Sequence, residues 1–247
     1  MNYADIKEVD IQDGEGVRVS LYVSGCHFHC KGCHNKEAWD FNYGNKFTEE
    51  TTKRILNLLD KNYITGLSIL GGEPLEPSNQ QGLVDLVKQV KQKFPDKTIW
   101  CWTGYDFEKD VFGKMYKEFP YTKQLLDNID IIVDGQFEEE NKLVNLKFRG
   151  STNQKKIDVQ ASIKMGETVR LAFGDEQRYS KEKPKVISIL EYKDKKENLN
   201  DNYISQIAQN NNILFDNEGQ NAEIKIEKVM PKVAAKNNTD ILQEDLK

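Results

Sequence analysis

The sequence predicts an α/β fold built on a mostly parallel sheet that helices cover. One observation predicts this fold, and a second predicts how the chain divides into a core and an appendix. Short, almost wholly apolar runs alternate along the chain with longer amphipathic runs, which is typical of buried parallel strands joined by helices. After about Gly174 the composition shifts to Lys, Asn, Asp and Glu. We therefore expect a core domain over residues 1–173 and a small αβ appendix over residues 174–247, with a mobile tail from about Lys232.

The composition narrows the class of protein. Of the 247 residues, 38% are apolar and 30% are charged, which fits a globular protein with a polar surface and enough length for a hydrophobic core. The formal net charge of −5 argues against nucleic acid as a partner, since binding it needs a basic face. No apolar run approaches the roughly 20 residues of a membrane span, and the N-terminus does not resemble a signal peptide. We expect a cytoplasmic protein with no membrane partner.

The first half of the chain predicts two strands and two helices. Residues 17–24 alternate apolar and polar positions, which indicates a strand. Residues 48–59 predict a helix with Thr48 as its N-cap. Residues 66–70 (G-L-S-I-L) predict a short buried strand. Residues 80–94 predict an amphipathic helix, which the following proline ends.

The second half continues the alternation. Strands are predicted at 98–102, 130–133, 146–149 and 157–159, and helices at 107–116 and 122–128. In the appendix, 186–192 and 222–229 predict strands and 203–209 a short helix. In a parallel sheet, functional residues gather in the loops at the carboxyl ends of the strands. These loops carry Cys26, Gly71, Thr103, Asp134 and Gly150, so we expect a single site at one edge of the sheet.

The loop after the first of these strands concentrates metal-binding side chains. Three of the four cysteines lie there in the spacing C-x3-C-x2-C, and all three histidines lie beside them: Cys26, His27, His29, Cys30, Cys33 and His34. The fourth cysteine, Cys101, falls in a predicted buried strand and is expected to be structural. Cysteines distributed three to one make a poor disulfide framework, so the cluster indicates a metal site or catalysis.

Three kinds of site compete for this loop. Structural zinc needs a closed tetrahedron, built from two short ligand pairs, and the chain offers only one such pair. A C-x2-C pair, here Cys30 and Cys33, also carries dithiol chemistry, but that leaves Cys26 without a role. An iron–sulfur cluster held by three thiolates uses all three cysteines and leaves one iron without a protein ligand. That iron can hold S-adenosylmethionine, whose one-electron cleavage yields a 5′-deoxyadenosyl radical. We favour the cluster.

A second motif supports the cluster. Gly71-Gly72-Glu73-Pro74 follows a predicted strand at the distance that the radical S-adenosylmethionine family shows, and with the cysteine spacing the chain resembles that family. The resemblance narrows to the activating proteins of anaerobic ribonucleoside-triphosphate reductases. It rests on M-N-Y at the N-terminus, D-G-E-G at 13–16, C-H-N-K at 33–36, I-W-C-W-T-G-Y at 99–105, V-D-G-Q-F at 133–137 and R-G-S-T-N-Q at 149–154. It covers residues 1 to about 160.

The resemblance implies a fold, cofactors and a reaction. The fold would be an open, partial (β/α)6-type barrel. The cofactors would be one [4Fe–4S] cluster on Cys26, Cys30 and Cys33, and S-adenosylmethionine. The enzyme would generate a glycyl radical on the large subunit of the reductase, with a flavodoxin-like protein as the electron donor. The residues expected at the cofactor are Gly32, Cys33, His34, Gly71, Gly72, Glu73, Asp134 and Asn153, with no catalytic residue beyond these ligands.

Some features leave alternatives open. Many radical S-adenosylmethionine enzymes place an aromatic residue before the third cysteine, whereas this chain has Gly32, so the adenine must rest on other surfaces. His34 is shared with the activating enzymes of pyruvate formate-lyase, which are one alternative. A small-molecule radical enzyme, such as a 7-carboxy-7-deazaguanine synthase, is another, and a zinc-binding interaction module is the alternative outside enzymes. The appendix lies outside the resemblance, and we expect it to help dock the reductase.

Overall fold

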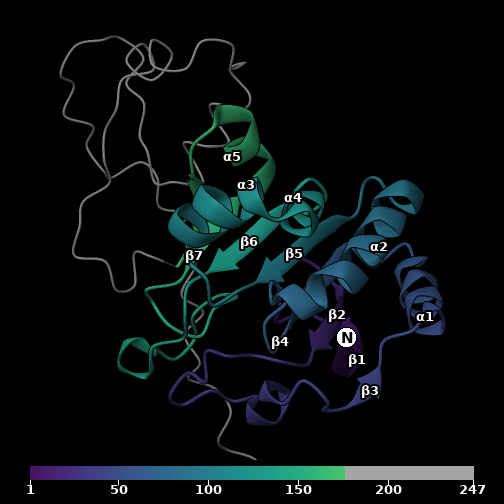
Figure 1. Cartoon of the computed structure of the whole chain (residues 1–247), viewed down its shortest axis with the longest axis horizontal. Helices are drawn as coiled ribbons and strands as arrows, with labels where there is room; N and C mark the ends of the chain where they lie inside the picture. Colours follow the sequence, from purple (N-terminus) through teal and green to yellow (C-terminus); the bar gives the residue numbers. More distant parts are fainter. Residues whose placement is uncertain (176–247) are drawn as a thin grey trace, which may run out of the picture.

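An eight-stranded sheet organises the part of the chain that the computed structural model describes, residues 1–175 (Figure 1). Its order is β3-β1-β2-β4-β5-β6-β7-β8. The strands are β1 (Asn2–Asp10), β2 (Arg18–Val23), β3 (Asn45–Lys46), β4 (Gly66–Gly71), β5 (Thr98–Trp102), β6 (Ile131–Asp134), β7 (Lys155–Asp158) and β8 (Val169–Leu171). The four central strands, β2, β4, β5 and β6, pair in parallel, and the pairings at both margins are antiparallel. The prediction of a mixed α/β fold with a parallel central sheet is confirmed.

A helix or helical turn follows each strand from β2 to β7. They are α1 (Glu49–Leu59), α2 (Pro77–Lys93), the π-helix η2 (Phe107–Met115), α3 (Tyr116–Glu118), α4 (Pro120–Leu126) and α5 (Val159–Met165), with 3-10 turns η1 (Lys36–Trp39) and η3 (Glu139–Asn141). The predicted cap of α1 is present: the Thr48 side chain accepts from the Thr51 amide, and the Thr51 side chain bonds back. The described helices include none that is both long and apolar enough to cross a membrane.

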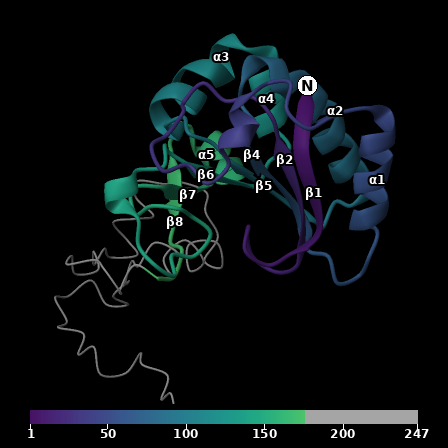
Figure 2. The same ribbon diagram turned by 90° about the horizontal axis from the view of Figure 1, so that it is seen from below.

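The two faces of the sheet have different surroundings. Alternate side chains of the central strands, among them Leu21, Ile69 and Ile99, are fully buried in one core with residues of α1, α2 and α4. Figure 2 shows these helices gathered on the same side of the sheet. The side chains in between point to the other face. That face carries polar and aromatic groups such as Tyr22 and Trp102, and it lines a cavity.

The structure corrects two local predictions. Residues 146–149, predicted as a strand, form a loop, because Asn145 (φ 66°) and Phe148 (φ 54°) adopt the left-handed conformation and interrupt any extended run. The helix predicted at 107–116 forms as a π-helix followed by a short α-helix. The segments predicted at 186–192, 203–209 and 222–229, and the tail from Lys232, lie outside the described residues.

Candidate functional site

One cavity of about 580 Å³ lies where the loops at the carboxyl ends of the parallel strands meet. It runs from the cysteine loop along the face of the sheet that faces away from the helices. Its walls include residues of every predicted strand-end loop: Cys26, Cys30, Cys33, His34, Gly71, Gly72, Glu73, Thr103, Gly104, Gly135, Gly150 and Gln154. The structure therefore brings these loops together around one cavity, as the sequence led us to expect.

The three clustered cysteines all line this cavity, and Cys101 does not. Cys101 is buried in the core on the opposite face of the sheet, as its place in strand β5 predicts. Burial raises the pKa of the Cys26 thiol to about 11, so the metal-free chain keeps this thiol protonated. A metal that binds there must displace the proton, because the thiolate is the ligand.

The backbone of the cysteine loop is fixed from both sides. The Gly25 amide donates to the Ala38 carbonyl at 2.8 Å, and the Cys26 amide donates to the Trp39 carbonyl at 3.1 Å. On the other side, the amide of Glu73 donates to the Gly25 carbonyl at 2.8 Å. The first cysteine is therefore placed by main-chain bonds that do not depend on a metal.

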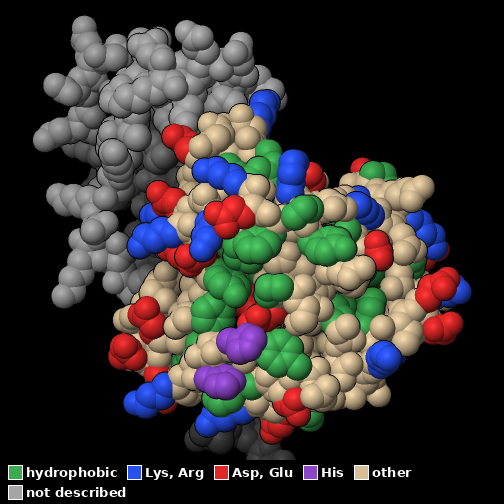
Figure 3. All heavy atoms as spheres, in the orientation of Figure 1, with side chains coloured by type: hydrophobic (Ala, Val, Ile, Leu, Met, Phe, Trp, Pro, Cys, Tyr) green, Lys and Arg blue, Asp and Glu red, His purple; other side chains and the backbone are tan. Residues whose placement is uncertain are grey.

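The histidines have separate surroundings. The His27 ring lies 2.9 Å from a Glu76 oxygen, and 76% of its side chain is exposed. The His29 ring stacks on Trp39 with centroids 4.5 Å apart. Figure 3 shows histidine side chains at the surface beside hydrophobic ones. His34 lines the cavity, which is a suitable position for the predicted contact with the cofactor. That contact stays a prediction.

Gly71 and Gly72 allow two loops to pack backbone against backbone. Gly71 has φ +112°, and an added Cβ would lie 2.6 Å from the amide nitrogen of Val23. A Cβ on Gly72 would lie 2.6 Å from the carbonyl oxygen of Gly25 and 2.7 Å from that of Ala38. We expected these glycines to make room for a ligand. The structure adds a reason within the protein: side chains here would push the Gly71 loop off the cysteine loop.

Glu73 joins the loops after β4 and β5. Its carboxylate is buried, and it accepts from the Leu75 amide and the Thr103 hydroxyl at 2.8 Å and from the Gly104 amide at 2.7 Å. Burial raises the pKa of this carboxyl to about 7, although the hydrogen bonds oppose the shift. Both oxygens are thus engaged with protein. The predicted contact with the cofactor's amino group stays a prediction, and the bonds across the loops were not expected from the sequence.

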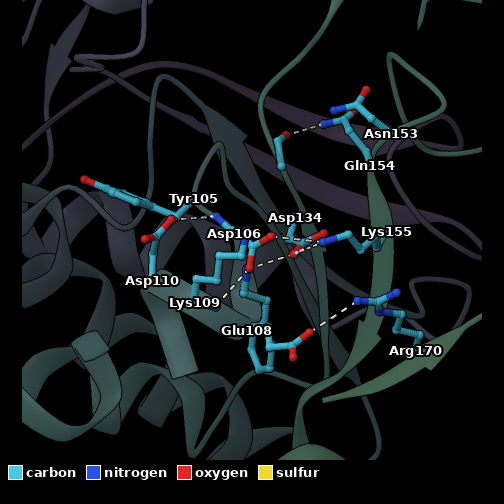
Figure 4. Close-up of polar contacts among 12 residues, drawn as sticks. Tyr105, Asp106, Glu108, Lys109, Asp110, Asp134, Asn153, Gln154, Lys155 and Arg170 are labelled. Carbon is cyan, nitrogen blue, oxygen red and sulfur yellow. Dashed lines mark hydrogen bonds and ion pairs between the residues drawn. The ribbon is translucent and has the colours of Figure 1, made fainter. Parts of the chain in front are cut away.

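Asp134 and Asn153 do not line the cavity, whereas their neighbours Gly135 and Gln154 do. Figure 4 shows Asp134 beside Lys155 and Asn153 beside Gln154. Asp134 accepts from the Phe107 amide at 2.8 Å and lies 3.6 Å from the Lys155 ammonium. Asn153 donates to the Gln136 carbonyl at 2.8 Å. Each keeps one buried side-chain oxygen, Oδ1, with no hydrogen-bond partner among the described residues. Buried acceptors of this kind normally have a partner. Because neither residue lines the cavity, their predicted contact with the cofactor stays a prediction.

Sequence reasoning missed the aromatic walls of the cavity. Phe28, Trp102, Phe137 and Phe148 all line it. The Trp102 indole nitrogen donates to the Phe148 carbonyl at 2.8 Å beside the cavity. The alternation along strand β5 was the available signal, since Cys101 faces the core and the residues on either side of it must face the other way.

The residues present fit an iron–sulfur cluster. No three His, Cys, Asp or Glu side chains of residues 1–175 are arranged around a point that would hold a single metal ion. The three thiols instead border one roomy cavity, and a cluster binds its thiolates through different iron atoms. The cavity of about 580 Å³ also leaves room for a second bound group.

Comparison with known proteins agrees with this donor set. A family model described as "4Fe-4S single cluster domain" matches residues 12–157, a range that includes all three cysteines and every loop of the cavity. The chain is therefore an iron–sulfur protein with a single-cluster domain.

The relatives define the family more closely. The chain is 41% identical to the anaerobic ribonucleoside-triphosphate reductase-activating protein of Enterobacteria phage T4 over 63% of its own length and 92% of the relative's. The proteins of the same name from Pasteurella multocida (41% identical, 62% and 95% covered) and Escherichia coli K12 (39%, 62% and 96%) match similarly. The chain belongs to the family of anaerobic ribonucleoside-triphosphate reductase-activating proteins. The resemblance inferred from its motifs is confirmed.

Proposed function

We propose that this protein activates an anaerobic ribonucleoside-triphosphate reductase by reductive cleavage of S-adenosylmethionine on a [4Fe–4S] cluster, which leaves a glycyl radical on the reductase. It is thus a radical S-adenosylmethionine oxidoreductase. One observation carries the proposal: Cys26, Cys30 and Cys33 line a single cavity, and no other described cysteine does. The chain that carries them belongs to the activating family.

The ligand set assigns roles to the residues of the cavity. Cys26, Cys30 and Cys33 hold the cluster and leave one iron for S-adenosylmethionine. We assign the second cofactor to Gly32, Cys33, His34, Gly71, Gly72, Glu73, Asp134 and Asn153. Of these, Cys33, His34, Gly71, Gly72 and Glu73 line the cavity. With both cofactors bound, the cluster would supply the electron that cleaves S-adenosylmethionine to a 5′-deoxyadenosyl radical. No further catalytic side chain is required, because the radical itself abstracts the hydrogen atom.

The protein's own task is to position the cofactors and exclude water. The Glu73 carboxylate ties the loops after β4 and β5 together through Thr103 and Gly104, so both keep a fixed distance from the cysteine loop. The rings of Phe28, Trp102 and Phe148 give the cavity apolar walls. Such walls limit side reactions of a strong hydrogen-atom abstractor with water.

The partners are part of the proposal. We propose that the sheet is an open, partial (β/α)6-type barrel, whose uncovered side would admit a glycine loop of the reductase. The cysteine loop reaches the surface, where the Lys31 side chain is 90% exposed, and a flavodoxin-like protein would deliver the electron there. We place the protein in the cytoplasm, and we divide it into a core at 1–173 and an appendix at 174–247 that helps dock the reductase.

Anaerobic reconstitution with iron and sulfide, followed by incubation with reductase, S-adenosylmethionine and a reductant, tests the proposal. We expect a glycyl-radical doublet in the EPR spectrum of the reductase. Replacing Cys26, Cys30 or Cys33 by Ala should abolish it, and Cys101→Ala, which changes only the core, should preserve it. A colourless protein that takes up only zinc would contradict the cluster. S-adenosylmethionine cleavage without a radical on the reductase would favour a small-molecule radical enzyme or the activation of pyruvate formate-lyase.

A further inference from the structure

A segment at the cavity wall, Lys147 to Arg149, is held from two directions. On one side, the Trp102 indole donates to the Phe148 carbonyl at 2.8 Å. On the other side lies Asp175. Its carboxylate accepts from the Lys147 amide at 2.7 Å and pairs with the Arg149 guanidinium at 2.8 Å. Phe148 and Arg149 both line the cavity, so these bonds fix the position of its wall.

The backbone of this wall needs such restraint. Phe148 has φ 54°, and Asn145, at the start of the same turn, has φ 66°. Left-handed backbone is unfavourable for a residue that carries a bulky side chain, and it persists only where surrounding contacts fix it. The bonds from Trp102 and Asp175 are such contacts: one holds the carbonyl of Phe148 itself, and the other holds the amide of Lys147, the residue before it.

The Arg149–Asp175 ion pair is deeply buried. Each side chain is 1% exposed, and the Arg149 guanidinium lies 3.8 Å from the centre of the Phe173 ring. Phe173 in turn packs with Trp100 and Val133 on the cavity face of the sheet. Removing one member of a buried ion pair is strongly destabilising, because the remaining charge loses a partner away from water. The wall is therefore more sensitive to the loss of Asp175 than to the loss of a surface charge.

We propose that Asp175 is a positioning residue, which holds residues 146–150 in the shape that binds S-adenosylmethionine. This inference rests on the proposed function. Asp175 lies outside the matched range 12–157 and just beyond the predicted end of the core at residue 173. Asp175, at the start of the predicted appendix, would therefore support the wall of the site.

Two substitutions in the full-length chain test this. Asp175→Ala removes both acceptors, and Asp175→Asn removes the charge but keeps one acceptor for the Lys147 amide. In the metal-free protein we expect hydrogen–deuterium exchange of a 146–150 peptide to rise about tenfold or more in Asp175→Ala, and less in Asp175→Asn. In the reconstituted protein the dissociation constant for S-adenosylmethionine should rise about tenfold in Asp175→Ala, since a displaced wall misplaces the ligand.

Arg170→Ala is the matched control. Arg170 lies in β8, five residues before Asp175, and pairs with Glu108 at 3.3 Å in an exposed position away from the cavity wall. We expect no change in exchange at 146–150 or in binding.

Wild-type exchange at 146–150 in a folded Asp175→Ala or Asp175→Asn protein would overturn the proposal. So would unchanged S-adenosylmethionine affinity in both variants. Lack of S-adenosylmethionine binding by the wild-type protein would instead contradict the proposed function, and the exchange measurement would still test the restraint of the wall.

Discussion

At the scale of single residues, the site depends on close backbone approach and on buried carboxylates. Gly72 marks where the cysteine loop and the loop after β4 touch, and Glu73 marks where the loops after β4 and β5 are joined. The glycine and the acid were both expected at the site, but the sequence indicated contact with a ligand for each. Their partners within the protein are set by long-range packing, for which local sequence carries no signal.

Replacing Gly72 by Ala should destabilise the protein and reduce cluster incorporation. The new Cβ would meet two backbone carbonyl oxygens at 2.6 and 2.7 Å, and neither can move without shifting the cysteine loop. Overpacking of this kind costs about 1–3 kcal/mol. Urea unfolding of the metal-free protein and the iron content after reconstitution measure the two effects.

Gly82→Ala serves as the comparison for this prediction. Gly82 lies within α2, and its added Cβ would meet only the flexible side chain of Met1, at 3.2 Å. Alanine favours a helix over glycine by about 1 kcal/mol, so this variant should be as stable as the wild type or more stable. Equal losses in the two variants would refute the steric argument.

Asp13 should make stability fall as the pH rises. Burial, opposed by a 2.5 Å bond from the Tyr22 hydroxyl, raises the pKa of Asp13 to about 6. The folded state therefore favours the protonated carboxyl, and its ionisation costs stability from about pH 4 up to pH 6. Asp13→Asn keeps an acceptor for Tyr22 and should stabilise the metal-free protein by about 1–2 kcal/mol at pH 8, after allowance for partial exposure.

The same substitution should have less effect at pH 3.5, where Asp13 is mostly protonated in both the folded and the unfolded state. Denaturant unfolding at the two pH values measures the difference. An equal effect of Asp13→Asn at both would show that Asp13 does not titrate as its burial indicates.

At the scale of elements, the sequence predicted a helix correctly where its apolar spacing and its capping residue indicate the same start. Helix α1 begins after Thr48, as the capping residue and the apolar spacing indicate. The central strands were likewise readable as short apolar runs. The run at 146–149 was not, because its conformation depends on left-handed residues and on bonds to Trp102 and Asp175. The cysteine grouping could be predicted from spacing alone, while the aromatic walls required knowledge of which face of β5 is covered.

The pairing of the central strands depends on a buried cation. Arg18 is fully buried and donates to the Ser68 hydroxyl, to the carbonyls of Leu67 and Thr98, and to the Thr98 hydroxyl, thereby joining β2, β4 and β5. Arg18→Lys keeps the charge but cannot reproduce the planar fork of donors, so it should destabilise the protein by about 3 kcal/mol.

Chemical denaturation compares this variant with Arg54→Ala, which removes an exposed pair with Glu8 at 3.2 Å. The surface change should alter the free energy of unfolding by less than about 1 kcal/mol. If Arg18→Lys were as mild as Arg54→Ala, the planar fork of donors would not be essential to the sheet.

At the scale of the whole molecule, the architecture separates stability from chemistry. Helices pack on one face of the sheet and form the core, whereas the other face is left for the cavity and its loops. The family and its cofactors could be predicted from the order and spacing of motifs along the chain. The involvement of Asp175 could not, because it lies beyond all of these motifs and contacts the site only through the folded chain.

The main-chain bonds of Gly25 and Cys26 also bear on what remains of the protein after oxygen destroys its cluster. Because main-chain bonds to residues 38, 39 and 73 fix the first cysteine, the loop does not rely on iron to take its shape. Air that destroys the cluster would therefore leave a folded chain with its cysteines still near one another. We expect such a chain to be repairable: once the thiols are reduced and iron and sulfide return, the same molecule can be refilled without being synthesised again.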